Sequence, residues 1–238
     1  MFYDLHMHTD MSDGSLTPAG IEKMARERYA KAGVADHVSR YHKIRDEKSF
    51  NAYIEALDRY DLFKGAEICL GTDLDISDAS FDRLDYIIGS MHALRFDRSL
   101  TLFFFDADVR FTDTAYFIQL YTERMVHFLS TERLDILGHP TLLPLFLQSK
   151  DPDGFFSDEQ YASIVRAGVQ NNVAFEISSR WRVPSVRFLS ECKSQGARVT
   201  FGSDAHSTED ALDFDYPIRI LQEAGLDFDS VFVPERKL

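Results

Sequence analysis

Short apolar runs alternate along the chain with longer stretches in which apolar positions recur at helical spacing. The apolar runs have the length of buried strands and lie at residues 63–69, 86–90, 134–138, 174–177 and 198–203. Helical spacing predicts helices at residues 46–62, 113–130, 158–171, 184–194 and 217–224. Strands that alternate with helices in this way are typical of a parallel α/β sheet, either open or closed into a barrel.

The start of the chain follows the same alternation. Thr17 suits the N-cap of a helix and Pro18 its first position. We expect this helix to continue to residue 32, because Gly33 follows and favours an end there. A very short strand is then predicted at residues 34–37.

Residues 94–112 depart from this alternation. The segment contains the run Leu102-Phe103-Phe104-Phe105 and is too long and too aromatic for an ordinary connector. We expect a lid over a site, an interface, or a local plug that covers a barrel edge, and composition does not separate these alternatives. Because no repeat, low-complexity tract or linker is present, residues 1–238 are predicted to form a single domain.

The composition supports one domain and narrows the class of partner. With 238 residues, 45% of them apolar, the chain can bury a substantial core. A formal net charge of -13 argues against an extended nucleic-acid surface, which needs clustered Lys and Arg, but it is compatible with a small anionic substrate. The sequence shows no secretion signal and no run near the ~18 apolar residues of a membrane span. We therefore expect a cytoplasmic protein without a membrane partner, of undetermined oligomeric state.

His6 and His8 are the first residues that indicate chemistry. If the predicted strand at residues 1–5 continues through them, both side chains point to one side, because side chains alternate along a strand. Two imidazoles on one face can grip a metal ion, and Asp13 follows in a loop that Gly14 makes flexible. Taken alone, the histidine pair is better explained by an exposed strand face.

Other histidines and carboxylates also follow the ends of predicted strands, where parallel α/β folds build their sites. Together the candidate metal ligands are His6, His8, Asp13, His37, Glu67, His92, His139, Asp204 and His206. Imidazole and carboxylate ligands suit zinc, manganese or iron, and the distant Cys69 and Cys192 form no motif for a thiolate site. Nine candidates are too many for one ion, so we expect two or three divalent ions that share a bridging carboxylate.

These residues occur in an order that resembles a known family. The pattern is His-x-His-(x4)-Asp-Gly, then Asp-His, Gly-x-Glu, Ser-x-His, Gly-His-Pro and Gly-Ser-Asp-Ala-His. Over residues 3–206 this ordered set resembles the PHP family, named for polymerase and histidinol phosphatase. The resemblance implies a TIM-like fold, a distorted (β/α)7 barrel, with a centre of two or three metal ions that hydrolyses phosphate esters. The short segment before His37 departs from the family pattern and predicts a stunted second strand.

The resemblance also implies how the ligands are divided. One ion would be held by His6, His8, Glu67 and Asp204. A second would be held by Asp13, His37 and His206. Glu67 would bridge to a third ion, which is held also by His92 and His139.

The resemblance implies metal-dependent hydrolysis of a phosphate monoester, with the activity of a histidinol-phosphate phosphatase as the leading one. Divalent ions lower the pKa of a bound water, supply hydroxide as nucleophile, and bind the phosphoryl oxygens. The proton donor to the leaving group is unassigned: Asp204 and His206 are candidates if they are not fully committed to metal, and a water relayed from a metal is an equal alternative. The alternatives are a nucleotide or oligonucleotide phosphoesterase, a metal-binding module without catalysis, and an amidohydrolase.

Arg180 and Arg182 follow the predicted strand at residues 174–177 and are the candidate substrate-binding residues. A guanidinium fork can bind phosphate oxygens that metals leave free, although a surface ion pair is the simpler explanation for Arg182. Glu176 is expected to pair with an arginine or with a ligand histidine. For His42 we expect a solvent-exposed position.

Overall fold

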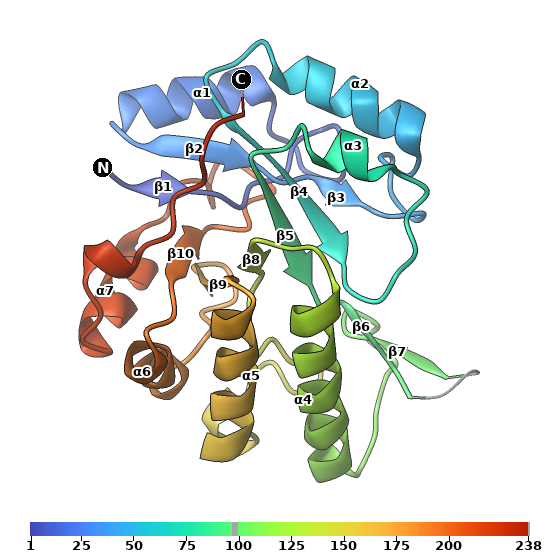
Figure 1. Ribbon diagram of the computed structural model, residues 1–238, viewed down its shortest axis with the longest axis vertical. Coiled ribbons are helices and arrows are strands. Elements are labelled where there is room, and N and C mark those ends of the chain that lie inside the picture. Colours follow the sequence, from blue (N-terminus) through green and yellow to red (C-terminus); the bar gives the residue numbers. More distant parts are fainter. Residues whose placement is uncertain (97–99, 238) are drawn as a thin grey trace.

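The computed structural model describes residues 1–96 and 100–237, which form a nearly closed, mostly parallel barrel surrounded by helices (Figure 1). The strands of the barrel are β1 (Tyr3–Asp4), β2 (Lys31–Val34), β3 (His37–Val38), β4 (Phe63–Cys69), β5 (Tyr86–Ser90), β8 (Ile136–Leu137), β9 (Ala174–Ser178) and β10 (Val199–Gly202). The helices are α1 (Pro18–Glu27), α2 (Glu47–Leu57), α3 (Asp78–Phe81), α4 (Thr114–Thr131), α5 (Asp158–Gln170), α6 (Val186–Gln195) and α7 (Asp215–Glu223). Single 3-10 turns lie at Pro152–Gly154 and Phe228–Ser230.

The strands follow the order β1-β2-β4-β5-β8-β9-β10, with parallel pairing throughout. β3 pairs with β4 beyond the end of β2, so within the described residues eight strands fill seven positions. The first and last strands meet through a hydrogen bond from Leu5 N to Phe201 O (3.1 Å) and a bridge between Met7 and Ala205. The predicted fold, a distorted α/β barrel, is confirmed.

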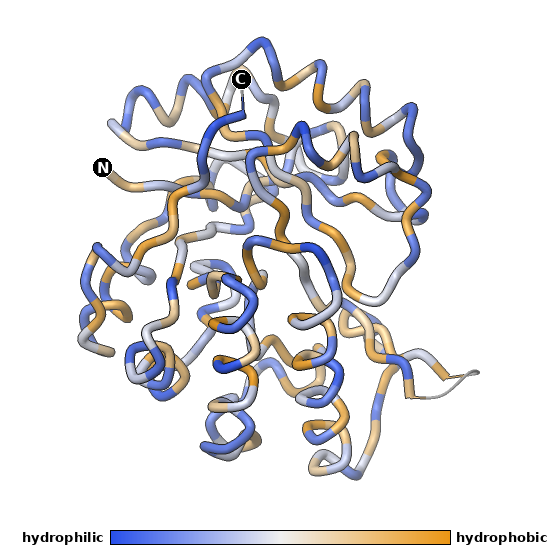
Figure 2. Tube along the Cα trace, viewed as in Figure 1, coloured by the Kyte–Doolittle hydropathy of each residue, from blue (hydrophilic) through white to orange (hydrophobic). Residues whose placement is uncertain are grey.

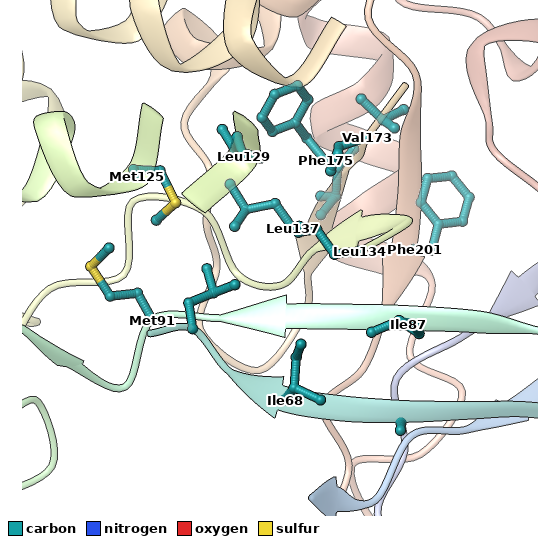
Figure 3. Packing of buried hydrophobic residues seen from close by; sticks show 14 of the residues in the cluster. Ile68, Ile87, Met91, Met125, Leu129, Leu134, Leu137, Val173, Phe175 and Phe201 are labelled. Atoms are coloured by element: carbon teal, nitrogen blue, oxygen red, sulfur yellow. The ribbon is translucent and has the colours of Figure 1, made fainter. Parts of the chain in front are cut away.

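Two groups of buried apolar side chains stabilise the barrel. One group lies between the sheet and the helices and includes Ile87, Leu137 and Phe175 (Figure 3). The other comes from alternate positions of the same strands, such as Ile88, and therefore faces the barrel interior, where Phe232 joins it. Hydrophobic and hydrophilic positions alternate along α4 and α5 in Figure 2, as expected for helices that bury one face.

The first helix begins as predicted but ends earlier. The Thr17 hydroxyl accepts a hydrogen bond from Gly20 N (3.1 Å) and caps α1. The helix ends at Glu27 rather than at residue 32, and Tyr29 turns the chain with a φ of 53°. The prediction of a longer helix is therefore wrong.

The last two residues of the predicted helix, Lys31 and Ala32, form the first half of β2 instead. β2 lies between β1 and β4 and hydrogen-bonds to both, so pairing in the sheet outweighs local helix propensity. Gly33 belongs to the strand, where a Cβ atom would overlap the Tyr86 hydroxyl. The very short strand predicted at residues 34–37 is the junction between β2 and β3. The second predicted helix is also shorter, since α2 ends at Leu57 rather than at residue 62.

The aromatic segment at residues 94–112 begins with an antiparallel hairpin that the sequence did not predict. Its strands are β6 (Ala93–Arg95) and β7 (Thr101–Phe103), and the intervening residues 97–99 lie outside the described part of the chain. Leu102 and Phe104 are buried, whereas Phe103 and Phe105 are exposed. A lid or an interface at this segment stays a prediction. In the described residues, no helix is both long and apolar enough to cross a membrane.

Candidate metal centre

The nine candidate ligands converge at the carboxyl ends of the strands. Most of them lie in the segments that follow the strands, whereas Glu67 lies within the last three residues of β4 and His37 begins β3 just after β2. Glu67, near the end of β4, lies at the middle of the group. Its two carboxylate oxygens are surrounded by five imidazole nitrogens: His6 Nε2 (3.4 Å), His92 Nε2 (3.3 Å) and His139 Nε2 (3.3 Å) near Oε1, and His37 Nδ1 (2.6 Å) and His8 Nε2 (3.6 Å) near Oε2.

The remaining two carboxylates flank the same histidines. Asp13 Oδ2 lies 3.6 Å from His37 Nε2 and 3.6 Å from His206 Nε2. Asp204 Oδ1 lies 3.0 Å from His8 Nε2. Three sets of donors have mutual distances below 4.8 Å: His8, Asp13, His37 and His206; His6, His8 and Glu67; and His37, Glu67 and His92. His8 and His37 belong to two sets each, so the structure groups the donors differently from the division that the resemblance implies.

Five donor atoms at the middle of the centre are buried and, within the described chain, make no hydrogen bond of good geometry, because their near neighbours are other candidate ligand atoms. They are His6 Nε2, both ring nitrogens of His8, and both oxygens of Glu67. A buried polar atom without a partner costs free energy, and native proteins leave few of them. A divalent cation is a partner for nitrogen and oxygen donors alike, and this donor set suits zinc, manganese or iron. The residues therefore fit a metal centre.

The charges of the centre keep its carboxylates in the ionised form that binds metals, but its imidazoles differ. Against their burial, the charge of Glu176 raises the pKa of His6 well above its usual value and that of Glu67 raises the pKa of His92 to about 10. Burial raises the pKa of Glu67, but the positive charges of His37 and His6 lower it well below its usual range. The pKa of Asp204 is lowered in the same way, against its burial, chiefly by His6. Burial, reinforced by His37, lowers the pKa of His8 to about 3, so this imidazole is neutral at pH 7. Ionised carboxylates and neutral imidazoles are the ligand forms.

Glu176 on β9 forms hydrogen bonds with two of the candidate ligand residues. Its Oε1 accepts a hydrogen bond from His6 Nδ1 (2.6 Å), and its Oε2 accepts one from His139 N (2.5 Å). The first bond holds a proton on His6 Nδ1, so Nε2 is the ring nitrogen that can give up its proton and bind a metal ion beside Glu67. The prediction that Glu176 pairs with a candidate ligand histidine is confirmed.

Asp36 supports the other side of the centre, a role that the sequence did not predict. It is buried and accepts hydrogen bonds from Thr9 N (2.6 Å), Thr9 Oγ1 (2.6 Å) and the Ser12 hydroxyl. These bonds fix the turn that separates His8 from Asp13. In the sequence, Asp36 is an acidic residue next to the candidate ligand His37. Its position alone does not tell whether such a residue binds a metal or supports a neighbouring ligand.

Trp181 and Arg180 hold the segment after β10. The Trp181 indole donates a hydrogen bond from Nε1 to Asp204 Oδ2 (2.5 Å), which leaves Oδ1 facing the histidines. Arg180 Nη1 donates to Asp204 O (3.2 Å) and lies 3.3 Å from His206 Nδ1. Arg180 therefore stands at the edge of the centre, as a phosphate-binding residue must.

Arg182, the second candidate substrate-binding residue, does not contact the candidate ligands. Its guanidinium lies 5.8 Å from the ring centroid of Tyr216 on α7, and no contact within the described residues joins it to a candidate ligand.

His42, in contrast, lies against one of the candidate ligands. The prediction of an exposed His42 is wrong, because its half-buried ring stacks on His37 at a centroid distance of 4.6 Å and its Nδ1 lies 2.8 Å from Ser39 Oγ.

The candidate ligands differ in their exposure to solvent. The side chains of His6, His8 and Glu67 are fully buried, whereas those of His206 and Asp13 are 24% and 43% exposed. Arg180, with a side chain 34% exposed, lies beside His206. A small substrate can therefore reach the donors from the Asp13, His206 and Arg180 side.

Two of the known proteins whose sequences are similar to this chain are named as phosphatases. A protein of Thermoanaerobacter sp. (strain X514) named "Probable phosphatase" is 24% identical over 184 residues, which cover 74% of this chain and 65% of that protein. A protein of the same name from Acetivibrio thermocellus is 22% identical over 175 residues, 69% of this chain and 61% of that protein. This chain thus matches less than two thirds of the length of either relative. No family model matches the chain.

The third likeness is structural. The crystal structure of histidinol phosphate phosphatase from Lactococcus lactis, complexed with zinc, L-histidinol and phosphate, superposes with a TM-score of 0.65. The two sequences are 17% identical, and the match covers 95% of this chain and 94% of that one. This likeness confirms the barrel fold and agrees with the resemblance to the PHP family predicted from the order of the motifs.

Proposed function

We propose that this protein is a metal-dependent phosphatase that hydrolyses a small phosphate monoester, as a histidinol phosphate phosphatase does. The observation that carries the proposal is the set of five buried donor atoms on His6, His8 and Glu67, which face other candidate ligand atoms without well-formed hydrogen bonds. Bound divalent ions would lower the pKa of a water molecule and neutralise phosphoryl charge. The zinc and phosphate in the Lactococcus lactis structure, and the name of the matched relatives, support this choice of chemistry.

The position of each candidate residue suggests its role in metal binding, phosphate binding or proton transfer. Two or three ions are proposed for the nine candidate ligands, with Glu67 shared between ions because five imidazoles surround its carboxylate. Arg180 would bind phosphate oxygens that the ions leave free. His206 is better placed than Asp204 to protonate the leaving group, because Asp204 is buried and its Oδ2 already accepts a hydrogen bond from Trp181 Nε1.

The decisive experiment combines metal analysis with a substrate panel. We expect two or three equivalents of zinc, manganese or iron, and turnover of phosphate monoesters, histidinol phosphate among them, that a chelator removes and added metal restores. His8→Ala should lose both metal and turnover. His127→Ala is the matched control, since His127 is exposed on α4.

The outcomes separate the alternatives. Turnover of nucleotides or oligonucleotide ends in preference to small monoesters would favour the alternative phosphoesterase activity. Metal binding without turnover of any phosphate ester would mean a binding module. Turnover that survives complete removal of metal would refute the proposal.

A second test concerns Arg180. Arg180→Ala should raise KM for a phosphate monoester by about tenfold or more, because a charge-assisted bond contributes on the order of 1.5–3 kcal/mol. Arg219→Ala is the control, because Arg219 pairs with Glu223 within α7 (2.9 Å). An unchanged KM in Arg180→Ala would remove its assigned role.

A further inference from the structure

The centre is bordered by an aromatic side chain from the hairpin segment. Phe105 is 42% exposed, although its neighbour Phe104 is fully buried. Its ring centroid lies 5.6 Å from that of His92 and 5.5 Å from that of Trp181. Main-chain hydrogen bonds from Phe104 N to His92 O (2.9 Å) and from Leu145 N to Phe104 O (2.8 Å) fix this stretch to the barrel.

Trp181 continues the border from Phe105 toward Arg180. Its indole nitrogen is tied to Asp204 Oδ2 (2.5 Å), and the Arg180 guanidinium lies 5.3 Å from its ring centroid. The ring therefore has fixed neighbours on several sides. We call Phe105 and Trp181 together the aromatic wall.

We propose that the aromatic wall makes the enzyme select phosphate monoesters whose leaving group carries a planar ring close to the ester oxygen. This inference rests on the proposed function, because it needs a phosphate held between the metal ligands and Arg180. An ester substituent that leaves this position toward Trp181 would lie against the wall, which contacts His92 through Phe105 and Asp204 through Trp181. The residues around His37 are polar instead, with Asp13 3.6 Å from its Nε2 and the His42 ring 4.6 Å from its ring.

The geometry suits stacking rather than general hydrophobic contact. Aromatic rings associate at centroid separations of about 4.5–7 Å, the range in which Phe105 and Trp181 already lie. A substrate ring that adds one such contact gains about threefold to tenfold in affinity over a saturated ring of the same size. Packing of the hairpin segment does not require Phe105 to be partly exposed beside a polar centre. Contact with a substrate ring accounts for this position.

The test uses two esters that differ only in planarity, benzyl phosphate and cyclohexylmethyl phosphate. Both have primary alkoxide leaving groups, so their intrinsic reactivities are close. We expect kcat/KM to favour benzyl phosphate by about threefold to tenfold in the wild-type protein. If neither ester is turned over, their inhibition constants against an ester that is turned over give the same comparison.

Three variants localise the effect. Phe105→Ala should bring the ratio between the two esters close to one. Phe103→Ala is the matched control, because Phe103 is 49% exposed on the same hairpin and should keep the wild-type ratio. Trp181→Phe keeps a ring in the wall while it removes the bond to Asp204, so it should keep the preference and weaken metal binding. Melting temperatures establish that each variant is folded.

The outcomes distinguish this inference from the proposed function. Equal wild-type constants for the two esters, or a Phe105→Ala variant that loses activity toward both by one factor, would overturn the aromatic wall and leave the phosphatase intact. A protein that hydrolyses no phosphate monoester at all would overturn both.

Discussion

Replacing Glu176 by glutamine tests whether the metal centre depends on the tautomer of His6. Glutamine has nearly the same shape but offers one acceptor oxygen where glutamate offers two. In the native structure both oxygens are in use, one by His6 Nδ1 (2.6 Å) and one by His139 N (2.5 Å). The site is completely buried, so water cannot replace a lost partner.

Either orientation of the new amide leaves a conflict. If its oxygen faces His139 N, its NH2 group faces His6 Nδ1, and the imidazole proton must move to Nε2, the atom directed at Glu67. If the amide is reversed, two N–H donors face one another at His139. The main-chain donor cannot change, so the first orientation is favoured, and His6 loses the lone pair that a metal ion needs.

The size of the effect follows from the loss of one orienting contact. Such changes lower metal affinity about 10-fold to 100-fold, which is about 1.4–2.7 kcal/mol. We would measure zinc affinity by competition with a chromophoric chelator and the His6 tautomer by nitrogen NMR. Glu191→Gln on α6 is the matched control, because the Glu191 side chain pairs with Gln195 of its own helix.

The reasoning predicts that affinity and tautomer change together. A folded Glu176→Gln protein that binds zinc within about twofold of the wild-type affinity would refute it. The same conclusion would follow if affinity fell while the His6 proton stayed on Nδ1.

Two further predictions concern stability. Gly33→Ala and Gly65→Ala should each destabilise the fold by about 1–3 kcal/mol through overpacking against Tyr86, and adding Tyr86→Phe should relieve the first change but not the second. The reason is that the Cβ added at position 33 meets the Tyr86 hydroxyl oxygen, whereas the one added at position 65 meets a ring carbon. If Tyr86→Phe restored the free energy of unfolding in urea equally in both variants, this explanation would be wrong. Hydrogen bonds, of which the one from the Ser80 hydroxyl contributes most, lower the pKa of Glu47 to about 2. Its folded pKa lies below the unfolded value near ~4.3, so the stability it contributes is present above that pH and is lost as pH falls toward 2. Glu47→Gln should accordingly be less stable than wild type at pH 6, with a difference that shrinks below pH 4; a constant difference would be contrary to the linkage.

The sequence predicted most of the barrel because its strands are unusually apolar and its polar residues stand at their ends. β4, β5 and β9 lie where the apolar runs predicted them. The nine candidate ligands could be chosen for the same reason: a histidine or carboxylate directly after a buried strand has few structural explanations. Their convergence then follows from parallel topology, which places all strand ends at one edge.

The remaining features depend on contacts that are distant in sequence. The first half of β2, Lys31 and Ala32, was predicted as helix because this segment acquires its strand character only from β1 and β4 on either side. The bond from Trp181 to Asp204 joins two loops, and the stacking of His42 on His37 requires the turn at residues 39–42. No local pattern encodes such contacts, which determine how the ligands are oriented.

The contacts that orient the ligands also cross the seam where the barrel closes. Asp4 on β1 accepts hydrogen bonds from Ser203 N (2.9 Å) and Leu212 N (3.0 Å), and His8 N donates to Ala205 O (2.9 Å). Because none of these bonds involves a metal ion, the closed barrel holds the ligand side chains near one another before metal binds. A divalent cation that binds only this closed form adds its binding free energy to the stability of the closure. The metal centre and the closure of the barrel therefore stabilise each other through the first and last strands.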